Sequence, residues 1–174
     1  MYRNGKDKTG RPIMYLRPGR DNTGMPHREV KLKYLVYLLE KCVQAMDEEN
    51  GVEKIVWIVD WKGYSQLSGM SMSKLSVEVL DIVQNHYPER LGVAYLFNPP
   101  WIWNVFWKMI SPFMTDVTKS KVKMMNNKDL KPILDAIDPE VLETEFGGNN
   151  PFKYNFEEHW LKDDTEFPIV NVEE

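Results

Sequence analysis

The chain of 174 residues is long enough for one compact domain with a core of its own. Apolar residues make up 43% of it and charged residues 28%, a balance that indicates a globular, soluble protein rather than a disordered chain. No apolar run approaches the ~18 residues needed to span a bilayer, no secretory leader is recognisable, and Cys42 is a single cysteine, which excludes an internal disulfide and fits a reducing compartment.

The net charge of −4 is unevenly distributed. Residues 150–174 hold seven acidic and two basic side chains, so the remainder of the chain is nearly neutral. This distribution does not indicate a basic face for nucleic acid, and no Cys/His cluster has the spacing of a metal site. A local basic patch for anionic lipid is compatible with the sequence.

Along the chain, apolar runs and turn residues predict alternating strands and helices. Residues 4–10 are polar and turn-like, and the expected strands are 12–16, 54–60, 91–98 and 121–125. Helices are expected over 28–50, 101–111 and 130–137, over a stretch from an N-cap at Ser73 to His86, and as a last turn over 139–145. The run at 54–60 is continuously apolar, as in strands covered on both faces. The sequence therefore predicts an α/β fold with a largely parallel sheet.

Residues 101–114, WIWNVFWKMISPFM, are the most apolar part of the sequence. Only Asn104, Lys108 and Ser111 are clearly polar, and their spacing places them in one stripe of a helix. Such a helix is buried on both sides or faces lipid, and it is too short to cross a bilayer. A central core helix explains the pattern as well, but three tryptophans within seven residues favour a helix that covers a cavity and meets a membrane.

An enzymatic function would require a nucleophilic side chain or a bound metal ion. Ser65 and Ser71 are the nearest candidates, and neither lies in a G-x-S-x-G elbow. His27, His86 and His159 have no recognisable partner spacing, and no phosphate-binding glycine motif occurs. We therefore expect a protein that is not an enzyme and needs no cofactor, with a lipid hydrolase as a disfavoured alternative.

Five short motifs follow one another in a recognisable order: DWKG at 60–63, HYPERLG at 86–92, NPP at 98–100, TDVTKSKV at 115–122 and LETEFGG at 142–148. In this order and spacing the sequence resembles the CRAL-TRIO lipid-binding domain, in particular its phosphatidylinositol-transfer branch, over roughly residues 5–148. The resemblance implies a lobe whose mixed, mostly parallel sheet floors an apolar lipid cavity, with a gate helix as its cover.

The resemblance also implies roles for individual residues. The gate segment, residues 101–114, would cover the acyl chains with the side chains of Trp101, Trp103, Phe106, Trp107, Ile110, Phe113 and Met114. Glu89, Thr118 and Lys121 match headgroup-region positions of the phosphatidylinositol-binding members, and Arg90 adjoins Glu89. Without the resemblance, Glu89 and Arg90 read as a solvated turn and Lys121 as an edge-strand charge that discourages aggregation.

Two departures from the family pattern have consequences for the ligand. Ile55 and Trp57 stand where phosphatidylcholine-binding members carry hydroxyl residues, which disfavours a choline lipid and favours another second ligand. Members usually also have an N-terminal helical lobe that adds a headgroup contact. This sequence begins close to the first strand of the lipid lobe, so either a preceding lobe belongs to a longer chain or this member lacks it.

These observations predict a lipid-binding lobe over residues 1–149 and an acidic C-terminal extension over 150–174 that is partly docked on it. The expected function is binding of phosphatidylinositol, and of a possible second lipid, with exchange between membranes. The expected protein is a cytoplasmic monomer that contacts membranes transiently and peripherally and binds no nucleic acid. The alternative is a non-transferring adaptor or membrane-tethering module in a signalling protein.

Overall fold

The computed structural model describes residues 1–20, 28–64, 69–101, 103–126 and 128–155, without the side chains of residues 69–74, 76 and 106. The expected N-cap at Ser73 is wrong, because α2 begins four residues earlier at Gly69 and residue 73 lies inside the helix. Residues 156–174 of the acidic extension lie outside the described parts. Within those parts, no helix combines the length and apolar character that a membrane span requires.

Five strands form one mixed sheet in the order β1-β2-β3-β4-β5. They are β1 (Tyr2–Lys6), β2 (Pro12–Leu16), β3 (Ile55–Asp60), β4 (Leu91–Phe97) and β5 (Val122–Met124). β1 pairs antiparallel with β2, and every other neighbouring pair is parallel, so the expected mostly parallel sheet is confirmed. β3 and β4 lie in the middle, as their continuous apolar sequences predict.

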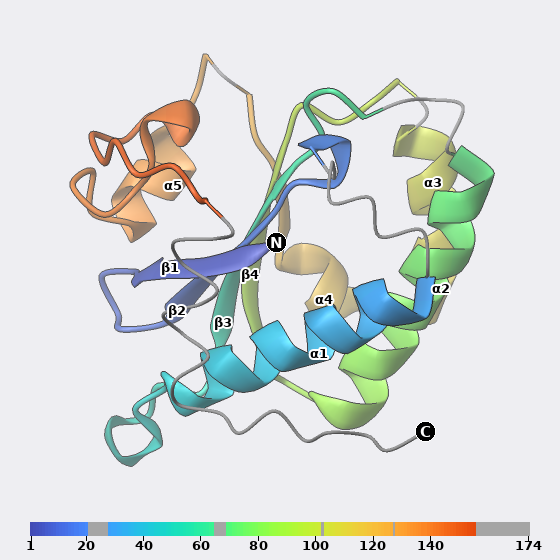
Figure 1. Cartoon of the computed structure of the whole chain (residues 1–174), viewed down its shortest axis with the longest axis horizontal. Coiled ribbons are helices and arrows are strands. Elements are labelled where there is room, and N and C mark those ends of the chain that lie inside the picture. The colour runs from blue at the N-terminus through green and yellow to red at the C-terminus, as the bar shows by residue number, and fades with distance from the viewer. Residues whose placement is uncertain (21–27, 65–68, 102, 127, 156–174) are drawn as a thin grey trace.

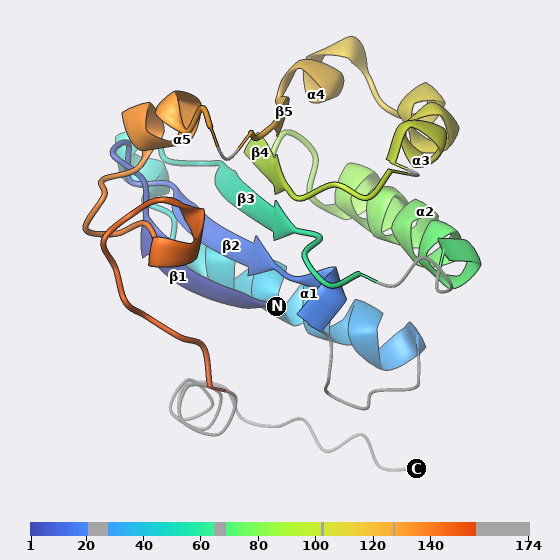
Figure 2. The ribbon, with the colours of Figure 1, turned by 90° about the horizontal axis from the view of Figure 1, so that it is seen from above.

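Helices cover both faces of the sheet (Figures 1 and 2). On one side lie α1 (Arg28–Gln44), α2 (Gly69–His86) and α3 (Trp103–Ile110), followed by the 3-10 turn η4 (Ser111–Phe113). α4 (Asp116–Ser120) leads from this layer into β5. On the other side lie α5 (Lys131–Ala136) and the 3-10 turn η5 (Thr144–Phe146). Two further 3-10 turns are η1 (Pro18–Arg20) and η2 (Glu48–Asn50).

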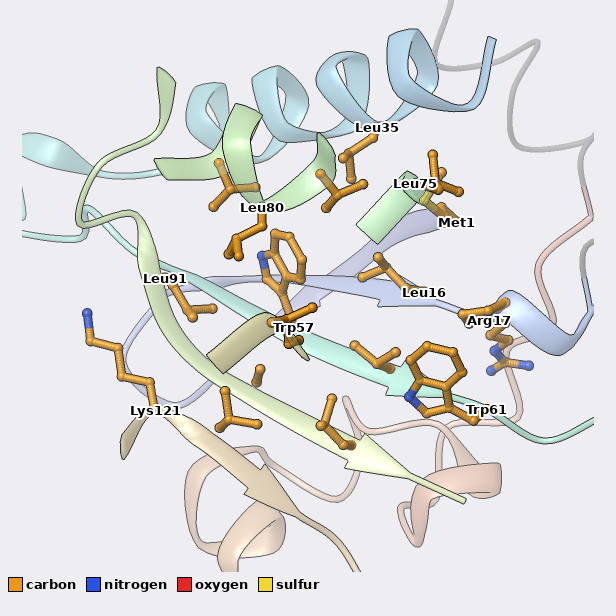
Figure 3. Close-up of a pocket in the computed structure, with 18 of the residues that line it drawn as sticks. Met1, Leu16, Arg17, Leu35, Trp57, Trp61, Leu75, Leu80, Leu91 and Lys121 are labelled. Atoms are coloured by element: carbon orange, nitrogen blue, oxygen red, sulfur yellow. The ribbon is translucent and has the colours of Figure 1, made fainter. Parts of the chain in front are cut away.

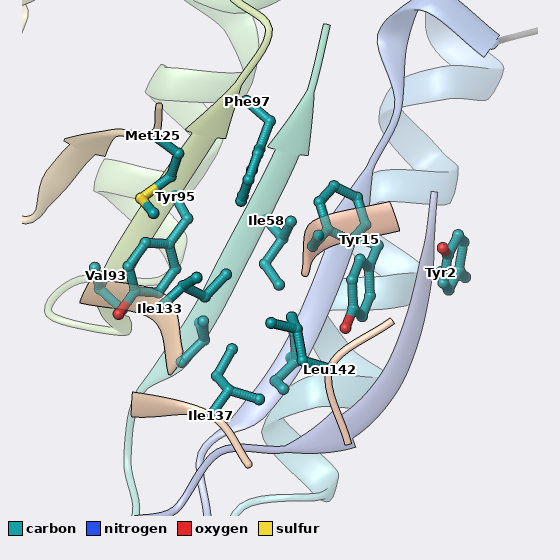
Figure 4. Close-up of a cluster of buried hydrophobic side chains, with 13 residues drawn as sticks. Tyr2, Tyr15, Ile58, Val93, Tyr95, Phe97, Met125, Ile133, Ile137 and Leu142 are labelled. Atoms are coloured by element: carbon teal, nitrogen blue, oxygen red, sulfur yellow. The ribbon is translucent and has the colours of Figure 1, made fainter. Parts of the chain in front are cut away.

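The face covered by α5 carries a closely packed core (Figure 4). Strand side chains alternate between the two faces, and here Ile58 of β3 and Tyr95 of β4 meet Ile133 and Ile137, all with little or no exposed surface. This closely packed core lies on one side of the sheet, while the opposite face carries the cavity described below.

The strand β1 was not expected, because residues 4–10 are polar and turn-like. Pairing with β2 and burial of the Tyr2 ring hold this polar segment in the sheet, and its register shifts between Arg3 and Lys6. Gly5, which lies inside the shift, has φ +72°, a conformation that glycine adopts without strain. Tertiary pairing thus overrides local composition here.

A large apolar cavity and its polar ends

A cavity of about 1450 Å³ lies between the sheet and helices α1, α2 and α3 (Figure 3). Its floor includes side chains that alternate in the strands with those of the closely packed core, namely Leu16, Trp57, Val59, Ala94 and Leu96. Leu91 joins them because the register between β3 and β4 shifts at the start of β4. Its walls include Leu35 of α1, Val79 and Val83 of α2, and Trp107 of α3. The volume exceeds the ~300–1,000 Å³ of typical small-molecule pockets.

The inner face of α3 closes one side of this cavity. Trp103 is only 9% exposed and packs edge-on against Trp61, which directly follows β3, with ring centroids 5.6 Å apart. Trp103 also stacks on Trp107 at 5.9 Å, and Ile110 is buried on the same face. Phe113 and Met114 line the cavity too. The side chain of Phe106 lies outside the described residues.

The outer face of the same segment is also apolar. Trp101 is 71% exposed and Val105 62% exposed, and Met109 and Phe113 present further apolar surface to solvent. Trp101 does not line the cavity, although the sequence analysis grouped it with the residues that do. Large exposed apolar groups that lie together indicate an interaction surface.

At one end of the cavity the structure brings together three residues that the sequence analysis assigned to the headgroup. Lys121 is largely buried, with 17% of its side chain exposed, and its Nζ lies 3.5 Å from Oε2 of Glu89. Thr118 faces the same end, with its Oγ1 3.0 Å from Oγ1 of Thr115, the N-cap of α4. A cation and two hydroxyl groups therefore meet at the mouth of an apolar space.

Glu89 adopts an uncommon backbone conformation. Its φ of +59° lies in the left-handed region, in the turn between α2 and β4. Such conformations cost free energy in residues other than glycine and gather at functional sites. The turn holds the carboxylate over Lys121 although 83% of the Glu89 side chain is exposed.

Other residues selected from the sequence lie elsewhere. The Arg90 guanidinium turns toward η2, where Nη1 lies 2.8 Å from Oε1 of Glu48 and donates to the carbonyl oxygen of Glu53, and Arg90 does not line the cavity. Ile55 is buried against α1, whereas Trp57 projects into the cavity between its two ends.

The opposite end of the cavity holds an ion-pair network that the sequence analysis missed. Arg17 pairs with Glu143, with 2.6 Å between Nη2 and Oε2, and also with Glu145, which in turn accepts a hydrogen bond of 2.8 Å from Arg20. Tyr2 donates to Glu143 at 2.9 Å. No local sequence pattern could have indicated this contact, because more than a hundred positions separate the arginines from the glutamates.

The two glutamates of this network differ in their electrostatics. Burial raises the pKa of Glu143 above its usual value, against the opposing effects of the Tyr2 hydrogen bond and Arg17. The hydrogen bond from Arg20 holds the pKa of Glu145 below its usual value. The network thus ties η1 to η5 across the carboxyl ends of β2 and β3.

The start of the C-terminal extension borders this end of the cavity. Tyr154 stacks on Tyr2 with ring centroids 4.5 Å apart and an angle of 3° between the planes, and Phe152 packs against the same ring. Lys153 and Tyr154 both line the cavity. Among the described residues, no group of three His, Cys, Asp or Glu side chains is placed to hold a metal ion.

These features define a class of protein: an α/β lobe in which a mostly parallel sheet and the helices on one of its faces line a large, partly open apolar pocket with polar groups at its ends. Residues 1–148 match the CRAL/TRIO domain, and the chain belongs to this family.

Known relatives agree with this assignment. The chain is 37% identical over 157 residues to the CRAL-TRIO domain-containing protein C23B6.04c of Schizosaccharomyces pombe, an alignment that covers 90% of this chain and 14% of that protein. It is 34% identical to the phosphatidylinositol transfer protein PDR17 of Saccharomyces cerevisiae, over 90% of this chain and 43% of PDR17. It is 33% identical to the SEC14 cytosolic factor of Candida glabrata, over 86% of this chain and 53% of that protein.

The fold also matches a solved structure. The crystal structure of Sfh5 superposes with a TM-score of 0.71 at 18% sequence identity, covering 98% of this chain and 66% of the Sfh5 chain. The alignments with the three sequence relatives cover 14%, 43% and 53% of those proteins, so the chain spans between about one seventh and about half of their length.

Proposed function

We propose that the protein binds a phospholipid, phosphatidylinositol, in the cavity and exchanges it between membranes. The observation that carries this proposal is the large apolar cavity with Lys121 and Thr118 at one end. The similarity to PDR17, whose name states phosphatidylinositol transfer, supports the choice of lipid.

The acyl chains explain why a carrier with such a cavity is useful. Each buried CH₂ group is worth ~0.8 kcal/mol, so two long chains resist transfer into water by on the order of 20 kcal/mol. The side chains of Leu16, Val59, Leu96 and Val83 replace the apolar contacts of the bilayer. No bond is made or broken in this exchange, so the proposed activity requires no catalytic group.

In this proposal the headgroup lies at the Lys121 end. The lipid phosphate accepts hydrogen bonds from the Lys121 ammonium and the Thr118 hydroxyl, and it displaces Glu89, whose exposed side chain can turn into solvent. Arg90 does not contact the headgroup in this proposal, because its guanidinium pairs with Glu48. It contributes by fixing the turn that it shares with Glu89. Trp57 supplies no hydroxyl group in the middle of the floor, which disfavours choline recognition there.

The gate segment would control entry of the lipid. With its inner face on the cavity and its outer face exposed, α3 can exchange contacts with Trp61 for contacts with lipid without exposing new apolar surface to water. The exposed side chains of Trp101 and Val105 would make the transient contact with the membrane. A monomer in the cytoplasm, peripheral to membranes, is sufficient for this cycle.

The decisive experiment is to purify the 174-residue chain from cells, extract it with organic solvent and identify the lipid by mass spectrometry. The proposal expects phosphatidylinositol at about one molecule per chain. A chain without stoichiometric lipid that also fails to move phosphatidylinositol between vesicles would instead fit a tethering module or adaptor.

A further inference from the structure

One row of side chains divides the floor of the cavity. In the register of the sheet, four residues lie side by side on β2 to β5 and point to the same face: Met14, Trp57, Ala94 and Val122. Met14 has no exposed surface and does not line the cavity, Trp57 projects into it, and Ala94 offers only a methyl group. The row is therefore high on β3 and low on β4 (Figure 3).

The Trp57 ring joins the floor of the cavity to its wall. It packs against both apolar clusters on this face of the sheet, the one that contains Leu35 of α1 and the one that contains Trp103 of α3. Because Met14 fills the space on the far side of the ring, an apolar chain that starts at β5 cannot run straight across the sheet to α1. In the described part of the structure, the route that stays open leads over Ala94.

Beyond Ala94 this route turns. The next row on the same face lies two residues further along the strands and lines the cavity with Leu16, Val59 and Leu96. Lys121 directly precedes Val122, so a chain whose headgroup lies at Lys121 first crosses from β5 to Ala94 on β4, a strand spacing of about 5 Å. It then follows β4 and β3 toward their carboxyl ends. The first step runs across the strands and the second along them, so the path bends beside the Trp57 ring.

We propose that Trp57 selects the acyl chain of the bound phospholipid, so that the protein favours phosphatidylinositol with a cis-unsaturated chain over its saturated counterpart. This inference rests on the proposed function, because it requires a headgroup at Lys121. A cis double bond puts a permanent bend into a hydrocarbon chain, whereas a saturated chain has to leave its extended, most stable rotamers to turn beside the ring. Trp57 therefore selects the shape of the chain, while Lys121 and Thr118 bind the headgroup.

The test offers the full chain a choice between two lipids that differ only in their double bonds. Distearoyl- and dioleoyl-phosphatidylinositol are added in equal, small amounts to phosphatidylcholine vesicles, and mass spectrometry identifies the lipid that the protein has taken up once the vesicles are removed. We expect the wild type to take up an excess of the dioleoyl form. Trp57→Leu should reduce this excess roughly fivefold, because it removes the ring from the path. Ala94→Val narrows the path beside the ring and should increase the excess.

The matched control is Leu16→Ala, which enlarges the same cavity in the next row, beyond the turn. An uptake ratio that is the same in the wild type, Trp57→Leu and Ala94→Val overturns the inference. A reduction as large in Leu16→Ala as in Trp57→Leu also overturns it, because cavity volume alone then explains the result. If Trp57→Leu fails to fold in urea denaturation, the opposite shift in Ala94→Val decides. Uptake of neither phosphatidylinositol by the wild type is a different result, since it contradicts the proposed function itself.

Discussion

Trp103 of α3 packs against Trp61 at the end of β3, and this contact separates the two faces of the gate segment. The inner face is held by aromatic packing, while Val105, two residues further on, lies in solvent. A substitution of Trp103 therefore reports on stability and one of Val105 on membrane binding, although both residues are apolar in the sequence.

Trp103→Asp should lower the free energy of unfolding by about 3 kcal/mol, because it removes a buried aromatic ring and buries a charge. Val105→Asp should leave stability within about 0.5 kcal/mol and weaken vesicle binding roughly tenfold, because the apolar side chain no longer enters the lipid. Urea denaturation and vesicle sedimentation measure the two effects. Unchanged vesicle binding by Val105→Asp would argue against a membrane role for the outer face.

Lys121→Ala should reduce phosphatidylinositol transfer roughly tenfold, because a charge-assisted hydrogen bond to the phosphate is lost. Lys119→Ala is the matched control: Lys119 lies two residues earlier, pairs with Asp116 at 3.0 Å and does not line the cavity. Transfer of pyrene-labelled phosphatidylinositol between vesicles measures both. Equal transfer by the two variants would remove Lys121 from the headgroup site.

Glu89→Asn should raise the free energy of unfolding by about 1 kcal/mol, since asparagine tolerates the left-handed backbone better than glutamate does. Glu89→Ala removes the same carboxylate without that conformational benefit and should not stabilise the protein. Thermal and urea unfolding of the two variants check this. If alanine and asparagine behave alike, the backbone conformation of Glu89 carries no measurable strain.

The Arg20–Glu145 pair predicts a pH dependence. The pKa of Glu145 is lowered in the folded protein, so its contribution to stability is present above the unfolded pKa and is lost as the pH falls through the folded pKa. Glu145→Gln should therefore lose less stability than the wild type between pH 7 and pH 3. The raised pKa of Glu143 acts in the opposite direction, and the Glu145 charge is one of its causes, so the difference between the two proteins reports the coupled pair Glu143–Glu145.

Much of the fold follows from local sequence. The runs at 55–60 and 91–97 form the central strands because continuous apolar, β-branched segments need cover on both faces. The short helix α4 was missed, although Thr115 as N-cap and Asp116 in the first turn are the signals for it. The strand β1 could not be predicted, since its polar sequence joins the sheet only through pairing with β2.

The residues of the candidate site could be predicted only in part from the sequence. Glu89, Thr118 and Lys121 were selected by the order of short motifs, and the structure brings them to one end of the cavity; their role in headgroup binding stays a prediction. Helical periodicity could not say whether Trp101 or Trp103 faces inward, because both sides of the helix are apolar. The Arg17–Glu143 pair depends on contacts across the whole lobe, which no local pattern records.

The stacking of Tyr154 on Tyr2 places residues near the two ends of the lobe side by side. A domain that the polypeptide enters and leaves at one point can be spliced into a larger protein with little effect on its neighbours. The same geometry makes it a candidate for circular permutation: a short flexible peptide could join residue 155 to residue 1, and new ends could open in a surface turn.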